Sequence, residues 1–143
     1  MQAFDTNLAA YAANVDSPQQ QAAAAFIDSL VPSDDVVVCE LMLVELFLKL
    51  CNAKIFATPM KPAEAVAHCN AYRRNPRWRV VENAPVMNSV WEAAARPDFA
   101  FRRIIDVRLA ATLRHHGVRR FATTNVKDFR GLGFSKVWNP LLP

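Results

Sequence analysis

Residues 36–51 read VVVCELMLVELFLKLC, a β-branched run followed by a stretch whose only charges are Glu40, Glu45 and Lys49. Three consecutive valines after a polar turn are typical of a short strand that is buried on both faces. The next stretch predicts a helix from about Glu40 to Cys51 that is apolar nearly all round, and therefore buried in the domain or in a subunit interface. A buried strand that leads into a buried helix indicates a parallel α/β fold.

The same alternation continues along the rest of the chain. The expected strands are Gln2–Asp5, Val36–Val38, Arg79–Val81, Arg120–Thr123 and Lys136–Trp138. The expected helices are Leu8–Ala13, a segment from Ser17-Pro18 to Leu30, Glu40–Cys51, Pro62–Arg74, Asn83–Ala95 and Phe101–His116. Strands that alternate with helices predict a parallel sheet that is covered on both sides and connected by right-handed crossovers.

The composition limits the class of protein. The 143 residues match one domain (1–143), and 52% hydrophobic with 21% charged residues excludes a disordered chain. No unbroken apolar run is longer than Ala22–Ile27, so we expect no membrane-spanning helix. Three cysteines without CxxC spacing argue against a disulfide framework and for the cytoplasm. The three glycines all follow residue 116, which excludes a Walker A loop and a dinucleotide fingerprint.

Polar residues collect where strands end and helices begin. Asp5 ends the first strand, Thr123 and Asn125 end a later one, and Glu45 and Asp106 lie near the starts of two helices. Because the carboxyl ends of parallel strands meet at one edge of the sheet, these residues are expected to converge there.

Converging carboxylates raise one another's pKa unless a cation lies between them. Mg²⁺ and Mn²⁺ prefer carboxylate ligands, and a pair of such ions can hold both the attacking and the leaving oxygen of a phosphodiester. The formal net charge of +4 favours a polyanionic partner. The pattern therefore predicts a metal-dependent nuclease.

Each acid also has a simpler interpretation. Asp5 can cap the helix that follows it, and Glu45 has a lysine four positions on, the spacing of an ordinary helix ion pair. Asp106 has two arginines within one turn, and Asn125 and Asp128 can be turn formers.

Glu40 and the arginine-rich segment Arg73–Arg79 can each be interpreted in two ways. Glu40 lies five residues before Glu45, about 140° round a helix, so it is either an outer-shell acid of the same site or a capping or solvated residue. The cluster Arg73–Arg79 either binds RNA through its arginines and Trp78, or is a solvated helix end with Trp78 in the core.

Four segments and the chain's end resemble PIN-domain ribonucleases, and among them VapC-type toxins of bacterial toxin–antitoxin pairs. The segments are Phe4-Asp5-Thr6-Asn7, Leu43-Val44-Glu45-Leu46, Ile105–Thr112, Ala122–Phe129 and the closing Val137–Leu141. Their order and spacing cover nearly the whole chain, from Ala3 to Leu141.

The resemblance implies a PIN-like α/β/α sandwich with a central parallel sheet of four to five short strands. It implies Mg²⁺- or Mn²⁺-dependent endonucleolytic cleavage of RNA, a homodimer, and inhibition by a small cognate antitoxin that places a basic side chain among the acids. By motif, Asp5, Glu45 and Asp106 bind the metal. The fourth catalytic position, often Asp in the family, is Asn125 here.

The outer residues of the implied site are Thr6 and Thr123, which orient the carboxylates, together with Glu40 and Asp128. Asp128 can partly compensate for the missing fourth acid. An alternative is that Asn125 marks a catalytically weak or inactive PIN-like module that binds RNA or the antitoxin.

Overall fold

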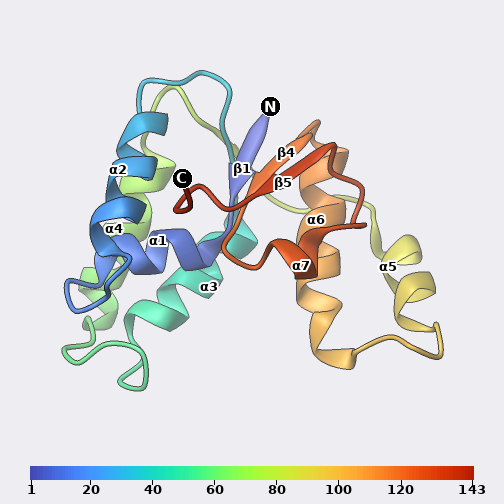
Figure 1. Ribbon diagram of the computed structural model, residues 1–143, viewed down its shortest axis with the longest axis horizontal. Coiled ribbons are helices and arrows are strands. Elements are labelled where there is room, and N and C mark those ends of the chain that lie inside the picture. The colour runs from blue at the N-terminus through green and yellow to red at the C-terminus, as the bar shows by residue number, and fades with distance from the viewer.

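Five short parallel strands lie at the centre of the computed structural model, which describes residues 1–143 (Figure 1). They are β1 (Gln2–Phe4), β2 (Val37–Cys39), β3 (Arg79–Val81), β4 (Arg120–Ala122) and β5 (Lys136–Trp138). One ladder joins β1, β4 and β5, and a second joins β2 and β3. A parallel bridge between Gln2 and Val36 connects the two ladders, so the strand order is β3-β2-β1-β4-β5.

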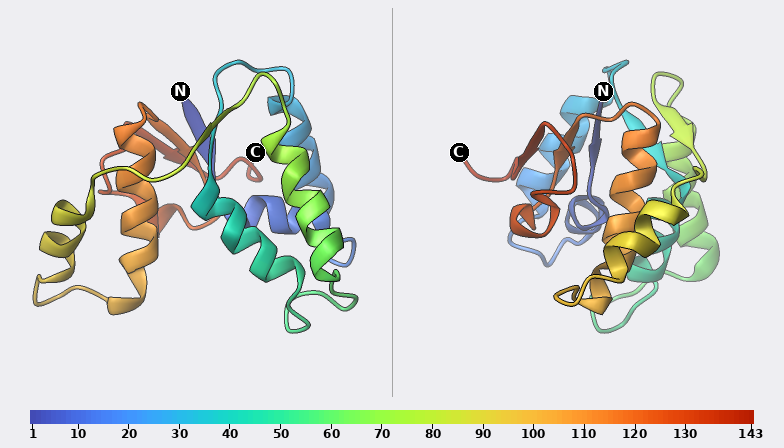
Figure 2. Two further views of the ribbon diagram at one scale, coloured as in Figure 1. Left: turned by 180° about the vertical axis from the view of Figure 1, so that it is seen from behind. Right: turned by 90° about the vertical axis from the view of Figure 1, so that its right-hand side faces the viewer.

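Helices cover both faces of this sheet. They are α1 (Thr6–Ala13), α2 (Gln20–Leu30), α3 (Glu40–Leu50), α4 (Pro62–Arg73), α5 (Met87–Ala94), α6 (Ile104–His115) and α7 (Val126–Phe129). In the right-hand view of Figure 2, α2 lies on one side of β1 and α6 on the other. Helix α5 projects from the body and packs against α6 (Figures 1 and 2). This is the predicted α/β/α sandwich.

The core forms where the β-branched strands meet the apolar helix faces. Val36, Val37 and Val38 are buried, as the valine run predicts, and Leu46 and Leu50 of α3 pack into the same cluster. Twenty-six buried residues make up this cluster, to which α5 contributes none.

The predicted elements are found with small shifts at their ends. Helix α5 begins at Met87 rather than Asn83, and a 3₁₀ turn (Phe101–Arg103) precedes α6. The sequence predicts only a turn where the short helix α7 lies, because four residues carry no readable helical period. None of the helices is both long and apolar enough to cross a lipid bilayer.

The arginine cluster of residues 73–79 matches the first of its two interpretations less well than the second, in which Trp78 belongs to the core. Trp78 is buried, and its Nε1 donates a hydrogen bond to the Leu30 carbonyl at 2.9 Å. Arg77 pairs with Asp34 at 3.1 Å. Trp78 is therefore a core residue and not a base-stacking platform.

Candidate active site

Asp5 lies at the carboxyl end of the central strand, directly after β1. Its backbone N–H donates to the Ala122 carbonyl at 2.8 Å, which fixes the residue beside the end of β4. The side chain is 6% exposed, and Thr123 Oγ1 donates a hydrogen bond to Asp5 Oδ2 at 2.7 Å. Asp5 occupies the cap position of α1 without a well-formed capping hydrogen bond, but the backbone N–H groups of Asn7 and Thr6 lie near enough to lower the pKa of its carboxyl group. Asp5 therefore combines the cap position of α1 with a place beside the end of β4.

Thr123 connects the ends of the two neighbouring strands. It is fully buried, donates to Asp5 and accepts a hydrogen bond from the Asn125 backbone N–H at 2.9 Å. One hydroxyl thus fixes both the orientation of a buried carboxylate and the backbone turn that leads into α7.

Thr6 lies beside Glu45 of α3 much as Thr123 lies beside Asp5. Its buried hydroxyl lies 3.3 Å from the Met42 carbonyl and 3.4 Å from Glu45 Oε2, and its single proton can serve either acceptor. The two threonines named from the sequence therefore both contact the carboxylates that they were expected to orient.

Glu45 lies in the second turn of α3, half-buried beside the end of β1. Burial raises the pKa of Glu45, and the negative charges of Asp5 and Asp106 raise it further, while Lys49 opposes them. Lys49 forms no ion pair with it: the four ion pairs of the structure involve other residues. The ordinary helix-pair interpretation of Glu45 is therefore wrong.

Asp106 lies in the first turn of α6, opposite Glu45. Burial raises the pKa of Asp106 above its ordinary value, Asp5 and Asp128 raise it further, and Arg103 lowers it. Asp106 also makes no ion pair. Burial likewise raises the pKa of Asp5, against the Thr123 hydrogen bond.

Asp5, Glu45 and Asp106 therefore form one electrostatically coupled group, which we call the acidic site. They come from positions far apart in the sequence, and none is neutralised by an ion pair. No group of three or more His, Cys, Asp or Glu side chains, these three acids included, is arranged so that it could hold a metal ion as it stands. The site is thus an open group of carboxylates rather than a closed cage.

Glu40 does not belong to this group. Its Oε1 lies 2.7 Å from Arg73 Nε, so an arginine of α4 neutralises it on the outer side of α3. Glu40 and Glu45 lie on different faces of the helix, as their spacing requires. The outer-shell interpretation of Glu40 is therefore wrong.

Asn125 directly precedes α7 and Asp128 lies within it, and both are exposed. The Asn125 backbone carbonyl accepts a hydrogen bond from the Asp128 N–H at 3.0 Å, as in a turn. Asp128 is close enough to raise the pKa of Asp106. Of the two, Asp128 is the residue whose charge acts on the acidic site.

Arg103 lies next to the acidic site. From the sequence alone, it is expected only to accompany Asp106 within one helical turn. Its guanidinium donates instead to the Asp128 carbonyl, and its Nε is buried without a hydrogen-bond partner. Sequence spacing cannot show this contact, because Asp128 follows Arg103 by 25 residues and a strand lies between them.

The donor set fits a hard divalent cation. Carboxylate oxygens are the preferred ligands of Mg²⁺ and Mn²⁺, and these ions keep several waters, so an open group of acids suits them. Coupled acids without an ion-pair partner are also the arrangement that a bound cation stabilises.

The chain is 50% identical to a named ribonuclease over almost its full length. "Ribonuclease VapC24" of Mycobacterium tuberculosis, found in two strains, aligns over 141 residues, covering 99% of this chain and 97% of the relative. No protein-family model matches the chain.

Solved structures with low sequence identity share the fold. VapC20 of Mycobacterium tuberculosis, described as a Sarcin-Ricin loop cleaving toxin, superposes with a TM-score of 0.59 at 18% identity, covering 85% of this chain and 87% of that one. FitAcB from Neisseria gonorrhoeae gives a TM-score of 0.64 at 22% identity, covering 98% of both chains. FitAB bound to an IR36 DNA fragment gives 0.63 at 18% identity, covering 100% and 97%.

Proposed function

The chain belongs to the VapC family of PIN-domain toxin ribonucleases, and we propose that its cleavage of RNA depends on Mg²⁺ or Mn²⁺ held by Asp5, Glu45 and Asp106. The observation that carries the metal proposal is the acidic site itself: three coupled carboxylates with raised pKa values and no ion-pair partner. The enzyme is an endoribonuclease, a hydrolase of phosphodiester bonds.

The side chains of the site divide the work between binding and orientation. Asp5, Glu45 and Asp106 supply the carboxylate oxygens. Thr123 fixes Asp5, and Thr6 steadies Glu45, so the acids hold their places in spite of mutual repulsion. When bound, the cation supplies Lewis-acid stabilisation of the charge that develops on the phosphate and lowers the pKa of an attacking water. Asn125 has a neutral side chain, and Asp128 supplies the fourth negative charge.

An antitoxin is the expected protein partner, since VapC proteins are the toxins of toxin–antitoxin systems. An antitoxin side chain with a positive charge would neutralise the acidic site and so inhibit the enzyme. The three cysteines are free thiols. Free thiols and an RNA substrate both fit action in the cytoplasm.

A second copy of the chain is the proposed partner of α3. Val44 and Leu48 of α3 are 54% and 61% exposed, and Val66 of the adjacent α4 is 49% exposed. Apolar side chains left exposed together on two neighbouring helices are typical of a subunit interface.

RNA cleavage with and without metal tests the proposal. The wild-type protein should cleave single-stranded RNA in Mg²⁺ or Mn²⁺ and lose this activity in EDTA. Asp106→Asn should reduce cleavage at least about 100-fold, because it removes a proposed ligand without removing bulk. Asp16→Asn, which changes an exposed acid in the loop after α1 that forms no ion pair, is the matched control and should cleave as the wild type does. Equal cleavage by Asp106→Asn, or full activity in EDTA, would contradict the proposal.

A weak or inactive site is the second candidate, and Asn125 is the observation that favours it. In that case the wild type binds RNA in Mn²⁺ without cutting it, and Asn125→Asp restores cleavage by supplying a charged ligand. Cleavage by the wild type at a rate that Asn125→Asp does not improve rejects this candidate.

A further inference from the structure

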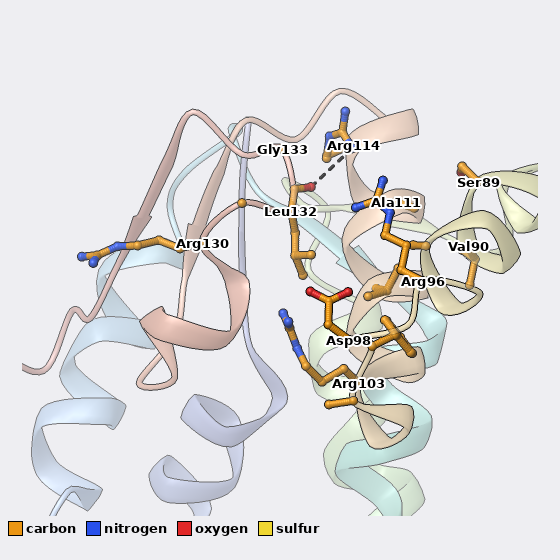
Figure 3. Close-up of a pocket in the computed structure, with 15 residues that line it drawn as sticks. Ser89, Val90, Arg96, Asp98, Arg103, Ala111, Arg114, Arg130, Leu132 and Gly133 are labelled. Carbon is orange, nitrogen blue, oxygen red and sulfur yellow. Dashed lines mark hydrogen bonds between the residues drawn. The ribbon is translucent and has the colours of Figure 1, made fainter.

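A cavity of about 480 Å³ lies between α5, α6 and the loop that follows α7 (Figure 3). One face of α6 lines it with residues at helical spacing. The connection from α5 to α6 and the loop after α7 form the other walls. The residues that matter here are Arg96, Asp98, Arg103, Arg114, Leu132 and Gly133.

Three arginines direct positive charge into this cavity. Figure 3 shows Arg96 and Arg114 near one end and Arg103 near the other, whereas the side chain of Arg130 points away. Asp98 is the only acid in the lining. The cavity therefore holds a formal charge of 3 − 1 = +2.

The arginines of this cavity are not among those that an acid neutralises. Arg73, Arg77 and Arg120 each form an ion pair with an acid. None of the cavity arginines does so, and the buried Nε of Arg103 has no hydrogen-bond partner at all. Unneutralised guanidinium groups around one cavity attract anions, and their planar fork matches phosphate oxygens.

Backbone contacts hold the far end of the cavity in shape. Arg114 donates to the Leu132 carbonyl at 3.3 Å, and a Cβ added to Gly133 would collide with the Arg114 guanidinium. The loop is fixed to β4 because Phe121 packs on Phe129 and stacks on Phe134, with ring centroids 4.6 and 5.0 Å apart. The arginine is thus positioned over a glycine in a packed loop.

The cavity starts beside the acidic site and runs away from it. Arg103 contacts the Asp128 carbonyl and lies close enough to Asp106 to lower the pKa of its carboxyl group. Arg114 lies eleven residues farther along the chain, about 16 Å along a helix axis. Positive groups spread over this length suit a strand with repeated phosphates better than one small anion.

We propose that this cavity, the Arg96–Arg114 pocket, binds backbone phosphates of the RNA strand on one side of the scissile bond. The inference rests on the proposed function, because it takes the acidic site as the place of cleavage. The arginines are positioning residues: they hold the strand so that its scissile phosphate lies at the acids.

RNA binding by the double variant Arg96→Ala/Arg114→Ala tests the proposal. The probe is a short fluorescein-labelled single-stranded RNA, and anisotropy is measured in EDTA across a salt series, with a gel to show that the RNA stays intact. We expect the Kd to rise about tenfold at low salt. The slope of log K against log salt should fall by about 1.4, the value for two lost phosphate contacts.

Two further variants separate a local effect from loss of charge or of folding. Lys54→Ala/Arg119→Ala removes the same charge from exposed side chains outside the cavity that form no ion pair, and its Kd should change much less. Asp98→Asn removes the one acid and should tighten RNA binding about twofold. A gain in affinity cannot come from misfolding.

Equal RNA affinity of the two double variants would overturn the proposal. Loss of binding to a fluorescent polyglutamate peptide, with RNA binding intact, would also overturn it and assign the pocket to an acidic protein segment. Failure of the proposed function would give a different result. The wild type would then leave RNA uncut in Mn²⁺, whichever of the variants binds RNA more tightly.

Discussion

Asp5 is the most constrained residue of the site, because it is a buried acid at the end of the central strand with one side-chain hydrogen bond. A buried carboxylate without a compensating donor destabilises the fold. Thr123 is therefore required for stability as well as for the geometry of Asp5.

Thr123→Val should lower the free energy of unfolding by about 1–3 kcal/mol, since it leaves the Asp5 carboxylate and the Asn125 N–H without their partner. Urea denaturation measures this change. Thr123→Ser keeps the hydroxyl and is the control. The explanation is wrong if the serine and valine variants are equally destabilised.

Asp106 carries a stability cost in the metal-free protein. Its pKa is raised in the folded protein, so the protonated side chain is the form that favours folding. This stabilisation is complete below the ordinary carboxyl pKa and is lost as the pH rises through the raised pKa, where the side chain becomes charged. Asp106→Asn should therefore raise the metal-free Tm at pH 7 by about 2–4 °C, and by less near pH 4. Differential scanning calorimetry checks both values.

Mn²⁺ should reverse that order. A cation that binds the folded wild type raises its Tm by mass action, whereas the Asn variant gains less. If Mn²⁺ raises both Tm values equally, Asp106 is not a ligand.

At the scale of elements, α3 carries two acids with opposite roles. Glu45 faces Asp5 and Thr6, and Glu40 faces Arg73 of α4. The sequence predicts the helix and the separation of the two faces, but not the partner of Glu40, which comes from a residue 33 positions away.

Glu40→Gln should leave RNA cleavage within about twofold of the wild type and change the free energy of unfolding by less than about 1 kcal/mol, as for a partly exposed ion pair. Glu45→Gln should remove cleavage. Matched assays of the two variants under Mn²⁺ decide the point, and a large loss of activity in Glu40→Gln would return that residue to the site.

Sequence patterns predict the elements that have a strong local signal. The valine run gives β2, Gly117 at φ 89° ends α6, and Asp5 and Thr123 each directly follow a strand. Helix α7 and the contacts of Arg103 have no such signal, because they depend on packing between segments distant in the chain. The acids of the site were predictable for the same reason that the sheet was: parallel strands bring their ends together.

At the scale of the whole molecule, the exposed apolar face of α3 and α4 predicts a dimer. Light scattering after size exclusion should give twice the chain mass of 16.0 kDa. Val44→Glu/Leu48→Glu should give the single-chain mass, while Val15→Glu, also an exposed valine, should not. A wild type that stays monomeric at high concentration would contradict the dimer.

The order β3-β2-β1-β4-β5 places β1 at the centre of the sheet, so Asp5 can meet acids from α3 on one side and from α6 on the other. The central claim is that these carboxylates share a divalent cation. Anomalous diffraction from crystals soaked in Mn²⁺ tests it most directly. The account predicts a manganese peak bounded by the carboxylates of Asp5, Glu45 and Asp106 that disappears in Asp106→Asn; a peak elsewhere, or one unchanged in the variant, would contradict it.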